Sequence, residues 1–70
     1  MKNENYNLIK MLHTKLDDMW RLENYYLRDA QKAKCAGCQK LYQTMIRDIK
    51  KHLELLTREV EAHAKSNRLK

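Results

Sequence analysis

The chain has 70 residues, a net charge of +6 at pH 7, one glycine and no proline. This length predicts one small domain, with too little chain for the large substrate pocket of most enzymes. The single glycine excludes a glycine-rich phosphate loop. No stretch approaches the roughly 18 consecutive apolar residues of a membrane span, and the N-terminus lacks the apolar core of a signal peptide. We therefore expect a cytoplasmic protein with no membrane contact.

The first arm, residues 4–34, has the apolar periodicity of a helix. Asn3 or Asn5 is a suitable N-cap for it. The spacing predicts a seam of alternating three- and four-residue steps, widened by Leu8, Trp20 and Leu27. Its members are Ile9, Leu12, Leu16, Met19, Glu23, Tyr26, Ala30 and Ala33.

A turn is predicted at residues 35–38, which read Cys-Ala-Gly-Cys and contain the only glycine. Three interpretations of Cys35 and Cys38 remain open. They are small thiols packed at a turn, half of a zinc site that a second copy completes, or a redox pair.

The second arm, residues 39–65, repeats the helical pattern, and a frayed tail is expected at 66–70. Its predicted seam consists of Tyr42, Ile46, Ile49, Leu53, Leu56, Val60 and His63. The fold class is thus all-α, an antiparallel two-helix hairpin. A hairpin has no third element to cover its apolar stripe, so we expect a homodimer that forms a four-helix bundle, or a higher oligomer.

Glu23 is the one charged residue of the first seam, and a buried carboxylate needs a partner. With the bend near residue 36, Glu23 is predicted to lie level with Asp48 and His52. Two carboxylates and an imidazole form a ligand set for iron, manganese or zinc. The alternative is that Glu23 hydrogen-bonds Tyr26, Tyr42 or His52, or reaches water at the edge of the bundle.

Two segments resemble the ferritin-like half-bundles, in particular the encapsulated ferritins. They are WRLENYYLRDA, residues 20–30, and RDIKKHLELLTREV, residues 47–60, about a third of the chain. The resemblance implies a hairpin that carries half of a di-iron site, with a glutamate on the first helix and a Glu-x-x-His pair on the second. His52 matches the histidine, whereas Ile49 stands where the glutamate would be and Asp48 is one residue away. If the chain is an enzyme, the resemblance implies a metal-dependent oxidase.

Two further groups of residues are candidates for binding. Glu59 and His63, four residues apart and predicted to lie near His13, form either a second metal site or a surface pair. The second arm is also strongly basic, with candidate phosphate contacts at Lys40, Arg47, Lys50, Lys51 and Arg58. A solvated helix face is the alternative explanation for these charges.

The sequence therefore favours a small homo-oligomeric bundle, ferritin-like and metal-binding between its helices. The alternative is a non-enzymatic regulator or adaptor that binds RNA or protein through the basic second helix.

Overall fold

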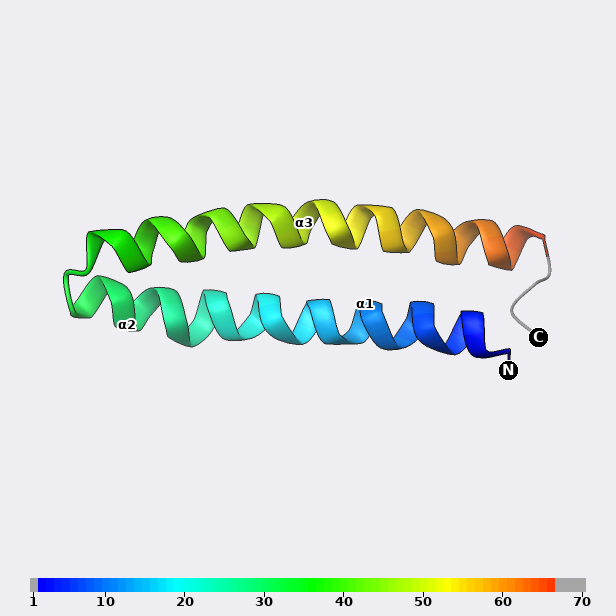
Figure 1. Cartoon of the computed structure of the whole chain (residues 1–70), viewed down its shortest axis with the longest axis horizontal. Helices are drawn as coiled ribbons and strands as arrows, with labels where there is room; N and C mark the ends of the chain where they lie inside the picture. Colours follow the sequence, from blue (N-terminus) through cyan, green and yellow to red (C-terminus); the bar gives the residue numbers. More distant parts are fainter. Residues whose placement is uncertain (1, 67–70) are drawn as a thin grey trace.

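In the computed structural model, which describes residues 2–66, the chain forms a long helical hairpin (Figure 1). The first arm consists of α1 (Asn3–Arg21), the π-helical turn η1 (Leu22–Tyr26) and α2 (Leu27–Lys32). The second arm is one helix, α3 (Ala36–Lys65). The all-α hairpin expected from the sequence is confirmed. Of the predicted frayed tail, residues 67–70 lie outside the described part of the chain.

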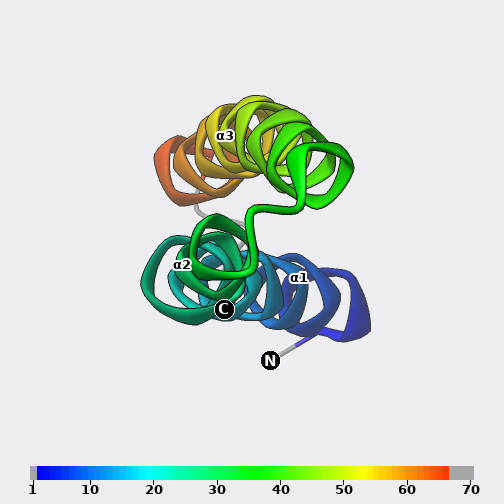
Figure 2. The ribbon, with the colours of Figure 1, turned by 90° about the vertical axis from the view of Figure 1, so that its left-hand side faces the viewer.

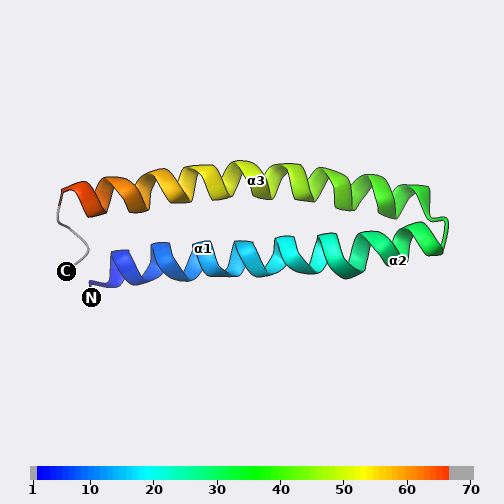
Figure 3. The ribbon, with the colours of Figure 1, turned by 180° about the vertical axis from the view of Figure 1, so that it is seen from behind.

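The hairpin is elongated, with both arms running its full length (Figure 3). Its extents are 49 × 16 × 14 Å and its radius of gyration is 15.4 Å. A compact chain of this length would have a radius of gyration of about 11 Å. Viewed along its length, the molecule consists of two stacked helical arms joined by a short loop (Figure 2). Each arm therefore has only one neighbour.

The bend is tighter than the sequence predicts and falls earlier in the chain, at Ala33, Lys34 and Cys35. The Cys35 N–H donates to the Ala30 carbonyl at 3.0 Å and the Lys34 N–H to the Gln31 carbonyl at 3.1 Å. This pair of bonds is a Schellman motif, in which the residue after the C-cap has a left-handed conformation. Lys34 has that conformation, with φ 55°.

Gly37, which the sequence analysis placed in the turn, lies instead in the first turn of α3. Its φ is not positive, and a Cβ built on it would meet nothing within 4 Å. The structure thus makes no use of the conformational freedom of the only glycine. The glycine therefore does not mark the break between the helices, which lies at residues 33–35 beside the predicted 35–38.

The π-turn η1 adds one residue to the first arm without ending the helix. Up to its first residue, buried or half-buried side chains recur at Leu12, Lys15, Met19 and Leu22. A regular continuation would bring Asp29 to the inner face, but Ala30 is buried there and Asp29 is exposed. The extra residue therefore rotates α2 so that a small apolar side chain faces α3.

A short apolar core lies in the middle of the hairpin. Met19 and Leu22 from the first arm pack with Ile49, and the half-buried side chains around them are Tyr42, Ile46 and Leu53. The second-arm seam is thus the predicted one. The first-arm seam is rotated, because Leu16 and Glu23 are exposed and Leu8, Lys15 and Leu22 take the inner positions.

Contacts between the arms fix their register. Tyr26 lies against Tyr42 with 6.0 Å between ring centroids, and Asn5 hydrogen-bonds His63 at the far end. Residues at the same level in the two arms are thus equally distant from Lys34 along the chain. The sequence had predicted residue 36 as this midpoint. As a result, Glu23 lies level with Met45.

Candidate functional site

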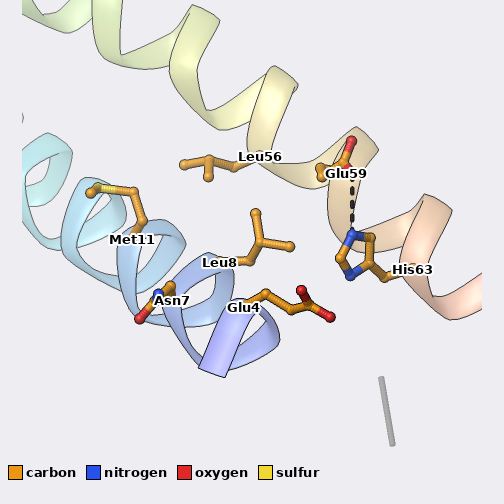
Figure 4. Close-up of a pocket in the computed structure, with 7 residues that line it drawn as sticks. All are labelled: Glu4, Asn7, Leu8, Met11, Leu56, Glu59 and His63. Carbon is orange, nitrogen blue, oxygen red and sulfur yellow. Dashed lines mark hydrogen bonds and ion pairs between the residues drawn. The ribbon is translucent and has the colours of Figure 1, made fainter. Parts of the chain in front are cut away.

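A groove runs between the two arms along one face of the hairpin. Near the open end it has a volume of about 520 Å³ and is lined by Leu8 and Met11 from the first arm and Leu56 from α3. Leu8 and Leu56 point toward each other from the two helices (Figure 4). The next hollow, about 370 Å³, adds Lys15, His52 and Leu55. Both arms therefore contribute apolar side chains to this surface.

The groove continues on the same face toward the bend. There it is lined by Asp18 and Tyr26 from the first arm and by Tyr42 and Met45 from α3. A last hollow at the bend includes both cysteines. We define the groove face by the side chains that line the first three of these hollows, so the hollow at the bend lies next to it. Charges of both signs, Lys15, Asp18, Arg21 and Glu59, accompany its apolar members.

A polar contact closes the open end of the hairpin. Asn5 is completely buried, and its Oδ1 lies 2.7 Å from Nδ1 of His63, which is 7% exposed. Nε2 of the same imidazole lies 3.1 Å from a Glu59 oxygen (Figure 4). Asn5 is therefore not the N-cap, a position that Lys2 holds without a side-chain bond. The pairing of Asn5 with His63 was not predicted from the sequence, although Asn5, Leu8 and Leu12 follow helical spacing.

The three residues predicted to bind a metal do not converge within one chain. Glu23, Asp48 and His52 are all exposed, and the register sets Glu23 about one helical turn from the level of Asp48 and about two turns from that of His52. Glu23 therefore does not need the buried partner on which that prediction depended. The second predicted cluster is formed only in part, because Glu59 and His63 are in contact while His13 is exposed on α1. Among residues 2–66, no three His, Cys, Asp or Glu side chains form a group that could hold a metal ion.

Cys35 and Cys38 are close together at the bend, and both are half-buried free thiols. The Cys38 N–H donates to the Cys35 sulfur at 3.3 Å. This bond makes Cys35 the N-cap of α3, so the first cysteine begins the second helix. The sequence had predicted both cysteines in the turn at 35–38, whereas Cys38 lies within α3.

The five predicted phosphate contacts on α3 are all exposed. Lys40, Arg47, Lys51 and Arg58 follow steps of seven and four residues, which place them in one row on the outer side of α3, and Lys65 continues it. Lys50 lies to the side of this row. In the described part of the chain, none of these cations forms a salt bridge; the ion pairs there involve Arg21 and His63.

The π-turn also arranges a pair of aromatic side chains. Trp20 and Tyr25 meet edge to face, with ring centroids 5.2 Å apart. Residues five apart point to different sides of an α-helix, and the wider π-turn brings them together. Both rings are about half exposed.

Comparison of the chain with known protein families, curated proteins and solved structures finds no match. No helix within residues 2–66 combines the length and apolar character needed to cross a membrane.

Proposed function

We propose that this chain acts as a self-associating helical hairpin, two copies of which pair through their groove faces into a four-helix bundle. The observation that carries the proposal is the imbalance of apolar side chains. Within residues 2–66, the buried apolar residues are only Met19, Leu22, Ala30 and Ile49. In the same part of the chain the exposed large apolar residues include Tyr6, Ile9, Met11, Leu16, Trp20, Tyr25, Tyr26, Leu41, Met45 and Leu55.

The exposed area supports a second copy as the partner. The accessible surface is 5538 Å² for a chain of 8.5 kDa. A compact monomer of that mass exposes about 4,700 Å², so the hairpin has a surplus of roughly 850 Å². A stable interface buries about 800 Å² on each partner. One symmetric contact therefore accounts for the surplus.

The groove face is the part of the surface best suited to that contact. It takes apolar side chains from both arms, including Met11 from α1 and Met45 and Leu55 from α3. A second hairpin has the same length and the same two-helix face, as a two-fold interface requires. Its positive and negative side chains allow complementary pairing across the dimer. The other exposed apolar strip, which includes Ile9 and Leu16, is on one helix only.

Sedimentation equilibrium of the full chain tests this proposal. We expect a dimer for the wild type and a monomer for Leu55→Glu, because a carboxylate at the centre of the interface would be desolvated without a partner. Leu16→Glu is the matched control, since Leu16 is similarly exposed but lies off the groove face. Circular dichroism checks that both variants stay helical. A monomeric wild type, or dissociation by Leu16→Glu alone, would refute the assignment.

The row of cations on α3 favours a second candidate function, the binding of single-stranded RNA. Lys40 to Lys65 span about 37 Å at 1.5 Å per residue. Large apolar side chains are absent from this row, which suits a phosphate backbone better than a protein surface. A groove-face dimer would leave the row exposed on its outer side.

Salt-dependent binding of a fluorescent single-stranded RNA separates this candidate from a plain solvated face. Each phosphate contact contributes about 0.7 to the slope of log affinity against log salt. We expect the Arg47→Glu, Lys51→Glu double variant to lower that slope by about 1.4. The control, Lys10→Glu with Arg28→Glu, makes the same charge change on the first arm. Equal losses in both double variants would contradict a specific role for α3.

A further inference from the structure

Cys35 belongs to both structural motifs of the bend. Its N–H completes the Schellman motif of the first arm, and its sulfur accepts the Cys38 N–H at the start of α3. With φ −89° and ψ 94°, its backbone is extended and non-helical, as at an N-cap. The sulfur is therefore fixed at the N-terminus of a helix of 30 residues.

This position favours a thiolate at Cys35. The N-terminus of a helix has a partial positive charge, and the first turn of α3 contains no acidic residue to offset it. Hydrogen bonds from the Cys38 thiol and the Cys38 N–H lower the pKa of Cys35. The same thiol contact, together with burial, raises the pKa of Cys38. The two thiols thus differ in the way that separates an attacking from a resolving cysteine.

Both cysteines line the hollow at the bend, next to the groove face. The hollow beside them has a volume of about 250 Å³, and its walls are formed mainly by Tyr26, Tyr42 and small alanine side chains. Asp29 is the carboxylate among these lining residues, and its charge opposes a thiolate there. A small linear molecule has room to reach Cys35 along this hollow.

We propose that Cys35 and Cys38 form a redox-active pair that reduces low-molecular-weight disulfides. The Cys35 thiolate attacks one sulfur of the substrate disulfide, which breaks the S–S bond, forms a mixed disulfide and releases one thiolate. Cys38 then loses its proton to that thiolate or to water and attacks the Cys35 sulfur. The second substrate thiolate leaves, so two electrons pass to the substrate and the pair becomes a disulfide.

The spacing of the two residues permits the second step. Side chains three apart in a helical turn are neighbours, with Cβ atoms about 5–6 Å apart. A disulfide requires about 3.5–4.5 Å between Cβ atoms, so the two residues must move slightly closer together. The contact between the Cys35 sulfur and the Cys38 N–H already brings the two residues together. The second step therefore needs a local adjustment and no separation of the arms.

Alkylation of the reduced wild-type protein with iodoacetamide, mapped by mass spectrometry, tests the asymmetry. We expect Cys35 to be modified several-fold faster than Cys38 between pH 6 and 8. Its rate should reach half of its plateau at a lower pH than that of an unstructured peptide with the same sequence. Equal rates at the two cysteines, or a profile identical to that of the peptide, would overturn the proposal.

Reaction with oxidised glutathione tests the two steps separately. The wild type should lose two hydrogens and retain no glutathione, Cys38→Ser should accumulate the mixed disulfide at Cys35, and Cys35→Ser should react much more slowly. Serine is a good N-cap, so Cys35→Ser keeps α3 capped. Similar rates for the two serine variants would contradict the assigned roles. The same assay in the Leu55→Glu background makes the result independent of self-association.

Discussion

The two arms of the hairpin differ in how their apolar residues are used. In α3 the inner face is the apolar seam itself, from Tyr42 through Ile49 to His63. In the first arm the inner face is rotated toward one edge of the apolar stripe, so Leu22 is buried while Leu16 is half exposed. An apolar pattern therefore indicates which broad side of a helix tends to be buried. The partner helix then determines which part of that side is covered.

The largest expected effects come from substitutions at the centre of the core. Leu22→Ala and Ile49→Ala should each lower the free energy of unfolding by about 2–4 kcal/mol, because each removes packed methyl groups. Leu16→Ala, the control at a predicted seam position, should cost clearly less. Urea unfolding at one fixed protein concentration measures all three.

Two outcomes would contradict the rotated seam. One is that Leu16→Ala lowers the free energy of unfolding as much as Leu22→Ala does. The other is that Leu22→Ala has a negligible effect on it. Because Leu22 and Ile49 belong to one cluster, the double variant should lose less than the two single losses together.

The next effect concerns the polar contact at the open end. Asn5→Ala should destabilise the hairpin by about 1–3 kcal/mol, because it leaves the Nδ1 of the buried His63 without this partner. Asn7→Ala is the control, since Asn7 is an exposed asparagine in the same helix. Thermal unfolding followed by circular dichroism distinguishes the two variants. Equal losses of stability would count against a specific role for the contact between Asn5 and His63.

The extent to which sequence predicts this structure depends on the kind of interaction. The two helices and the α3 seam follow from apolar periodicity, which is a local property. The inner position of Asn5 follows the helical spacing of Leu8 and Leu12, but its partner His63 is 58 residues away, and no local pattern reveals that pairing. The predicted level of Glu23 was wrong because the bend was centred two residues late. The cysteine pair was recognised, whereas the capping role of Cys35 depends on the same bend.

The bend offers a smaller effect, in the stabilising direction. Lys34→Gly should raise the free energy of unfolding by roughly 0.5–1 kcal/mol, because glycine adopts a left-handed conformation without strain. Gly37→Ala should raise it by a similar amount of about 0.5–1 kcal/mol, since a Cβ there meets open space and restricts the unfolded chain. Chemical unfolding measures both. A loss of stability in either variant would contradict the described bend.

The smallest expected effect comes from a deletion in the π-turn. Removing Glu23, which is exposed, should convert η1 to regular α-helix and leave Ala30 on the inner face, with little change in stability. Removing Lys10 from α1 is the matched control, because it rotates Asn5 and Leu8 by about 100° relative to the rest of the arm. Unfolding curves should therefore resemble the wild type for the first deletion and shift strongly for the second. The reverse order would refute the inserted-residue interpretation of η1.

The bend has no residue to spare, because every residue in it makes a backbone hydrogen bond to the first arm. Ala33, Lys34 and Cys35 all have backbone N–H groups bound to the last turn of the first arm, and Cys35 also caps α3. An extra residue there would shift one arm against the other and separate Asn5 from His63. An extra residue within an arm can be absorbed locally, as in η1. Natural insertions and deletions are therefore expected at exposed positions along the arms, while the spacing from Ala30 to Cys38 stays constant.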